Sequence, residues 1–250
     1  QKGSAVLLGD TRFSIEREAE YFLRVETRQA AGVIQLSPNF PGDISAYTPS
    51  TPFVNACECL HEAPYPTVNI DNTDAAKTVT DYLISIGHRR IGCLLGPDGP
   101  TMHSPITRDR LRGYQQALSD ASIPLEEQYL IPGDFSLQSG RDASNLFLKC
   151  SPRPTAIFCM NDEMAFGLVQ GLKSQGLRVP EDMSVAGFDD IEFAQYCDPA
   201  LTTISQPAED IGRTAMRTLI NILESGADAV QRHVLPTQLI VRDSTAAPIT

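Results

Sequence analysis

The chain has 250 residues, 42% of them hydrophobic, and its 31 acidic and 20 basic residues give a net charge of −11. A chain of this length can bury one large core or two smaller ones. It has no apolar run long enough to cross a bilayer, which excludes a membrane-spanning protein. Its acidic surface repels phosphate groups, so any contact with DNA would need a basic module outside this sequence.

Short apolar runs alternate with amphipathic segments along almost the whole chain. The runs predict strands at residues 5–8, 32–36, 67–70, 91–95, 129–131, 155–159 and 184–188. Between them, apolar residues at three- and four-residue spacing predict helices that contain Ile15, Ala76, Leu111, Ala165 and Ile211. This alternation predicts an α/β fold with parallel sheets and right-handed crossovers.

Glycine and proline mark the expected helix ends. Gly87, Gly176 and Gly226 each follow the last apolar position of a predicted helix, and Pro207 opens the last helix. A late strand pair is expected after that helix, at residues 234–241. A strand pair after the last helix favours two similar lobes between which the chain crosses several times.

The sequence lacks the motifs of common catalytic sites, namely the phosphate-binding loop, the dinucleotide fingerprint and the nucleophile elbow. His88 follows a helix-ending glycine and is expected to be a charge at the helix end. The six cysteines, including the pair Cys57 and Cys59, do not have zinc-site spacing and are expected to be reduced thiols. We therefore predict no catalysis, no metal, no cofactor and a cytoplasmic location.

Polar or aromatic residues stand just beyond the predicted strands. They are Asp71, Asn72, Asp74, Arg110, Phe135, Asn161, Asp162 and Asp189. Each has a structural alternative: Asn72, Asn161 and Asp162 could cap helices, Phe135 could be core, and Asp189 could lie in a solvated turn. Taken together, carboxylate, carboxamide, guanidinium and an aromatic ring at one sheet edge suit a hydroxylated small molecule.

A series of short motifs covers nearly the whole chain. They are Ile70-Asp71-Asn72, Gly87-His88-Arg89-Arg90-Ile91-Gly92, Gly96-Pro97, Arg110-Leu111-Arg112-Gly113-Tyr114, Asn161-Asp162-Glu163-Met164-Ala165-Phe166-Gly167, Val179-Pro180-Glu181-Asp182, Gly187-Phe188-Asp189-Asp190 and Leu201-Thr202-Thr203-Ile204-Ser205-Gln206-Pro207. In this order and spacing they resemble the effector-binding core of the LacI-type bacterial transcription regulators, relatives of the periplasmic sugar-binding proteins. Gly133-Asp134-Phe135, residues 155–159 and residues 195–199 resemble the cytidine-sensing members of that family.

The resemblance implies two Rossmann-like lobes of the periplasmic-binding-protein type, joined by three crossovers, with a ligand between them. We expect residues 1–90 plus 206–228 in the first lobe and residues 91–205 plus 229–250 in the second. The resemblance assigns Arg110, Asn161 and Asp189 to sugar hydroxyls and Phe135 to the ring of the ligand. Gln206, on a crossover, and Asp74 are the remaining ligand-binding residues that it implies.

The resemblance also implies partners and leaves alternatives open. We expect a homodimer that binds operator DNA through a helix-turn-helix preceding the core, senses cytidine or a related nucleoside, and works beside the cyclic-AMP receptor protein. One strand–helix unit that usually begins such cores is not matched in this sequence. Cys57-Glu58 stands where sugar-binding relatives often have Asp-Arg, which disfavours a plain sugar. The alternatives are a solute-binding protein of a transporter and a nucleoside hydrolase or phosphorylase.

Overall fold

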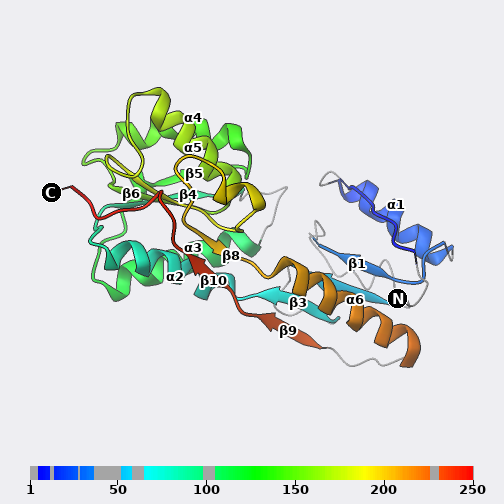
Figure 1. Ribbon diagram of the computed structural model, residues 1–250. Coiled ribbons are helices and arrows are strands. Elements are labelled where there is room, and N and C mark those ends of the chain that lie inside the picture. Colours follow the sequence, from blue (N-terminus) through cyan, green and yellow to red (C-terminus); the bar gives the residue numbers. More distant parts are fainter. Residues whose placement is uncertain are drawn as a thin grey trace. The chain divides into compact units, whose positions relative to one another are not determined.

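The computed structural model describes residues 5–11, 14–27, 29–36, 52–57, 65–97, 105–225 and 231–249. The chain divides into two compact units (Figure 1), which are described separately. Unit 1 comprises residues 1–69 and 209–233, and unit 2 comprises residues 70–208 and 234–250. The chain therefore passes from one unit to the other three times, as expected from the family resemblance.

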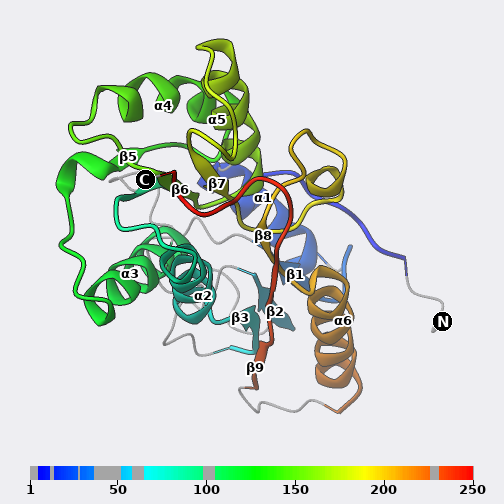
Figure 2. The ribbon, with the colours of Figure 1, turned by 60° about the vertical axis from the view of Figure 1, so that its left-hand side comes forward.

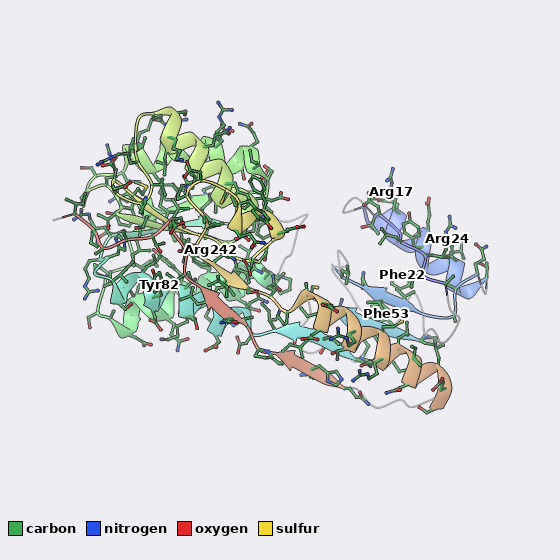
Figure 3. The ribbon with its side chains drawn as sticks, in the orientation of Figure 1. Arg17, Phe22, Arg24, Phe53, Tyr82 and Arg242 are labelled. Atoms are coloured by element: carbon green, nitrogen blue, oxygen red, sulfur yellow. The ribbon has the colours of Figure 1, made fainter. Side chains whose placement is uncertain are left out.

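Unit 1 is built on a four-stranded sheet with the order β1-β2-β3-β9. The strands are β1 (Val33–Gln35), β2 (Phe53–Ala56), β3 (Thr67–Ile70) and β9 (Arg232–Leu235), and the first three are parallel. The helices of this unit within the described ranges are α1 (Ile15–Glu26) and α6 (Ala208–Ser225). Phe22 of α1 packs on Phe53 of β2 with ring centroids 5.9 Å apart (Figure 3), and Tyr65 meets Phe53 edge-on. This aromatic contact fixes α1 to its sheet.

Unit 2 is built on a four-stranded parallel sheet with the order β5-β4-β6-β7. The strands are β4 (Ile91–Leu95), β5 (Leu130–Pro132), β6 (Ala156–Cys159) and β7 (Ser184–Ala186). Beside them, β8 (Thr203–Ser205) pairs antiparallel with β10 (Gln238–Ile240). The strands are apolar at almost every position because helices cover both faces of the sheet.

Two helix pairs cover the sheet of unit 2. The helices are α2 (Asn72–Ser85), α3 (Pro105–Asp120), α4 (Leu137–Lys149) and α5 (Asp162–Ser174), with short 3-10 turns at Glu127–Tyr129 and Glu192–Gln195. Figures 1 and 2 show α2 with α3 on one side of the sheet and α4 with α5 on the other. The α2–α3 contact is close enough to require Gly113, because any side chain there would overlap the Thr73 carbonyl of α2.

Most predicted elements are present, with several differences. Residues 5–8 form no strand and their apolar side chains are exposed, while β2 and α4 were not predicted. Gly87 and Gly176 have the expected positive φ, and Gly226 lies outside the described residues. The units change at 69/70, 208/209 and 233/234, whereas 90/91, 205/206 and 228/229 were expected. The first difference arises because α2 packs along α3 and so belongs to unit 2. Of the helices in the described ranges, none is both long and apolar enough to span a membrane.

Candidate functional site

The candidate site lies at the carboxyl edge of the parallel sheet of unit 2. Phe135 comes shortly after β5, Asn161 after β6, Asp189 after β7 and Gln206 directly after β8. The carboxyl ends of parallel strands share one edge, which brings Phe135, Asn161 and Asp189 to the same place. Gln206 joins them because Ser205, at the end of β8, forms a parallel bridge with Asp189. The remaining strand of this sheet, β4, is followed along the chain by α3, which supplies Arg110.

Arg110 is the centre of this cluster. Its side chain is 3% exposed, its Nε donates to Asn72 Oδ1 at 2.9 Å, and its Nη1 donates to the Met160 carbonyl. The guanidinium lies over the Phe188 ring, 3.5 Å from the centroid, and Nη2 is 3.6 Å from Asp189 Oδ1. A buried guanidinium held on several sides is a rigid, charged donor.

Asp189 is the anionic member of the cluster, and its side chain is 29% exposed. Gln206 Nε2 donates to Asp189 Oδ1 at 2.6 Å. Burial raises the pKa of Asp189, whereas the Arg110 charge and the Gln206 hydrogen bond oppose that rise. Both side-chain contacts involve Oδ1, so within the described residues Oδ2 is the oxygen left for a further donor.

Asn161 joins two strand ends. Its Oδ1 accepts from the Met164 N–H and caps α5, and its Nδ2 donates to the Phe135 carbonyl, each at 2.9 Å. The capping alternative is therefore confirmed, and the same side chain also fixes Phe135. Phe135 has a left-handed φ of 68°, and its ring lies against Gly96, where any side chain would overlap it.

The first turn of α2 differs from the sequence-based expectation. Asp71, not Asn72, caps this helix by accepting from the Asp74 N–H at 2.9 Å. Asn72 is buried and instead accepts from Arg110, a partnership that the sequence did not reveal. The Asp74 side chain is exposed, and the contacts that define the cluster do not include it. Phe188 and the Met160 carbonyl were also missed, although Phe188 directly precedes Asp189 in the Gly187-Phe188-Asp189-Asp190 motif.

The expected helix-end charge at His88 is wrong. The ring is 1% exposed, with Nδ1 2.8 Å from Thr155 Oγ1 and Nε2 2.9 Å from the Ala246 carbonyl. Burial lowers the pKa of His88, so the imidazole is neutral at pH 7 and ties the C-terminal segment to the sheet.

The cysteines and acidic groups of the described residues give no sign of a metal site. No group of three or more His, Cys, Asp or Glu residues within the described ranges could hold a metal ion. The described cysteines, Cys57, Cys93, Cys150, Cys159 and Cys197, form no disulfide, and Cys59 lies outside the described residues.

Comparisons with known proteins agree with this architecture. Residues 80–245 match the model of a periplasmic binding protein-like domain. The HTH-type transcriptional repressor CytR of Escherichia coli (strain K12) is 39% identical over 98% of this chain and 71% of that protein. The HTH-type transcriptional repressor PurR of Photobacterium profundum is 30% identical over 97% of this chain and 72% of that protein.

Solved structures give the same result. A LacI family transcriptional regulator from Enterococcus faecium, with bound ribose, superposes with a TM-score of 0.82 at 30% identity, covering 92% of this chain and 85% of that one. The transcriptional regulator CelR in complex with cellobiose has a TM-score of 0.84 at 31% identity, covering 92% of this chain and 71% of that one.

The fold and the polar cluster at its sheet edge therefore define an α/β binding protein of the periplasmic-binding-protein type, with two parallel sheets. More closely, the chain belongs to the LacI family of transcriptional regulators and corresponds to their effector-binding core. It is a regulator domain and not an enzyme.

Proposed function

We propose that this chain is the sensing and dimerisation core of a cytoplasmic transcriptional repressor whose effector is a pyrimidine nucleoside, with cytidine as the first candidate. The observation that carries the proposal is the contact of Asp189 with both Arg110 and Gln206 at the carboxyl edge of the unit 2 sheet. The motifs that resemble cytidine-sensing regulators, and the 39% identity with CytR, support a nucleoside rather than a plain sugar.

In this proposal the cluster recognises a ribose and a base separately. Asp189 and Arg110 bind the vicinal hydroxyls of ribose, because a carboxylate and a guanidinium can each take two hydrogen bonds in one plane. Phe135 stacks on the base, and Asn161 and Gln206 complete the polar lining. Asp74, exposed on the first turn of α2, is the sixth residue of the proposed set.

The effector would act by shifting a conformational equilibrium. A ligand changes the population of two states only through its different affinity for each. In a homodimer such a shift alters the distance between two DNA-binding headpieces, and thus their fit to operator half-sites. The net charge of −11 supports a DNA contact made by a separate helix-turn-helix module. The cyclic-AMP receptor protein is the partner on DNA that we propose.

A solute-binding protein of a transporter shares the periplasmic binding protein-like domain, but the repressors CytR and PurR, at 39% and 30% identity, favour the regulator. The two candidates differ in what precedes the core in the full-length protein. A basic helix-turn-helix would support the repressor, whereas a secretion signal would support the transporter component.

A binding panel tests the nucleoside proposal. Cytidine, uridine, adenosine, free cytosine and ribose are compared by thermal shift and by calorimetric titration. A ligand at about one hundred times its Kd stabilises the native state by about 2.7 kcal/mol. If no pyrimidine nucleoside produced a thermal shift or a calorimetric signal, the proposed effector would be refuted.

A variant pair tests the residues. Asp189→Asn keeps an acceptor for Gln206 but removes the charge. It should weaken the binding of cytidine about 10- to 100-fold, because hydrogen bonds to charged groups contribute about 1.5–3 kcal/mol. Asp198→Asn is the matched control, since that side chain is 96% exposed and pairs with Lys173. Equal affinities in the two variants would contradict the role of Asp189.

A further inference from the structure

The loop that carries Asp189 has an unusual backbone. Residues 187–191 follow β7, and Asp189 and Asp190 have φ angles of 119° and 56°. Positive φ at a residue with a side chain costs about 1–3 kcal/mol and persists only where surrounding contacts enforce it. Something in unit 2 must therefore hold this loop in place.

Asp162 provides that contact from beneath the loop. It is the first residue of α5 and its side chain is fully buried. Its Oδ2 accepts from the Ile191 N–H at 2.9 Å, and its Oδ1 accepts from Thr203 Oγ1 at 2.6 Å. At Gly187 any side chain would overlap Asp162 Oδ1, so the loop backbone lies directly on the carboxyl group.

The two donors to Asp162 belong to the two segments that carry the polar cluster. Ile191 ends the loop of Asp189, and Thr203 begins β8, which ends directly before Gln206. The segments are also joined by the Asp189 N–H, which donates to the Ile204 carbonyl at 2.8 Å. Asp162 thus contacts both of the segments that bring Gln206 and Asp189 together.

A buried carboxyl group is a costly way to make these contacts. Burial raises the pKa of Asp162 to about 7, and the nearby Asp189 and Asp190 add to this effect, while the hydrogen bonds from Thr203 and Ile191 oppose it. The cations of this region are engaged elsewhere: Arg110 pairs with Asp189, and Arg242 pairs with Asp190 at 2.7 Å. Among the described residues, no salt bridge includes Asp162. A group this unfavourable in the core is retained for what it positions.

We propose that Asp162 is a positioning residue of the effector site. It holds residues 187–191 against β8, so that Asp189 and Gln206 are placed for the ribose hydroxyls, without itself contacting the effector. This inference rests on the proposed nucleoside-sensing function and adds a residue that acts through others.

The affinity test uses two independent variants and one control. Asp162→Asn loses the charged acceptor, and Thr203→Val removes only one of the two hydrogen bonds, so it keeps the test open if the first variant folds poorly. Glu163→Gln, an exposed neighbour in the same helical turn, is the matched control. Each is titrated with cytidine and with 2′-deoxycytidine.

We expect both variants to bind cytidine about tenfold more weakly, as for loss of a charge-assisted hydrogen bond, and to lose most of the preference for cytidine over 2′-deoxycytidine. If Asp162 had only a structural role, both ligands would bind equally more weakly and the preference for cytidine would stay intact. An unchanged preference, or a Glu163→Gln effect of the same size, would overturn the proposal.

Hydrogen–deuterium exchange without ligand separates this inference from the proposed function. Amide exchange in residues 187–191 should accelerate in Asp162→Asn and stay unchanged in Glu163→Gln. If the wild-type chain binds no nucleoside, the nucleoside function fails, while the exchange result still decides whether Asp162 holds the loop. Unchanged exchange would refute the positioning role even if cytidine binds.

Discussion

The buried carboxyl group of Asp162 should make unit 2 less stable as the pH rises. Its pKa is about 7 in the folded chain, against an ordinary value of 3.8. Because the folded-state pKa is raised, the folded chain binds more protons than the unfolded chain between these two values. The stabilising contribution of the Asp162 carboxyl group is therefore complete below pH 3.8 and is lost as the pH rises through about 7.

The size of this effect follows from the two pKa values. A shift of about three units corresponds to about 4 kcal/mol in total, of which about 2 kcal/mol should be lost between about pH 5 and about pH 7. Other groups titrate in this range too, so the useful quantity is the difference in unfolding free energy between the wild type and Asp162→Asn. Asparagine keeps an acceptor for the Ile191 N–H but does not titrate.

Urea unfolding followed by circular dichroism, at several pH values in this window, gives that difference directly. We expect it to shift by about 2 kcal/mol in favour of the variant from about pH 5 to about pH 7. The exposed-site variant Asp198→Asn is measured in parallel as the control. A constant difference for Asp162→Asn would refute the reasoning, as would a carbon-13 NMR titration that places the Asp162 midpoint near its ordinary value.

Four further substitutions test other parts of the fold. Gln35 is buried, yet neither polar atom of its side chain has a hydrogen-bond partner among the described residues, so Gln35→Leu should stabilise the chain by about 1–3 kcal/mol in chemical denaturation; a loss of stability would show that the carboxamide is satisfied. Gly113→Ala should cost about 1–3 kcal/mol because the new methyl group meets helix α2, whereas Gly212→Ala, which meets nothing, should raise the melting temperature. Because burial lowers the pKa of His88, the unfolded chain takes up its proton first, so the stability of the wild type relative to His88→Gln should fall as the pH drops below about 6.5; pH-independent melting differences would contradict this.

The amino-acid sequence by itself predicted the architecture and the sheet edge at which the candidate site residues lie. Alternating apolar and amphipathic segments require parallel sheets covered by helices, and this is a local property of the sequence. Polar residues directly after apolar runs, such as Asn161 and Asp189, must then lie at one sheet edge, and unit 2 brings them there.

Some local signals were misleading because their outcome depends on distant partners. Residues 5–8 are as apolar as a strand, but a strand forms only where a neighbour pairs with it, and here these residues are exposed. Helix α4 was not predicted, although its buried residues Gly140, Ala143 and Phe147 recur at three- and four-residue spacing.

Only the tertiary structure decided which groups meet. His88 reads as a helix-end charge until the carbonyl of Ala246, 158 residues away, is found at its ring. The sequence around Asp162 suggests a helix cap, whereas in the structure its carboxyl group accepts from Thr203 and Ile191, which belong to two other segments. Burial and hydrogen-bond partners are set by contacts between segments far apart in the chain, and a pattern of neighbouring residues carries no record of them.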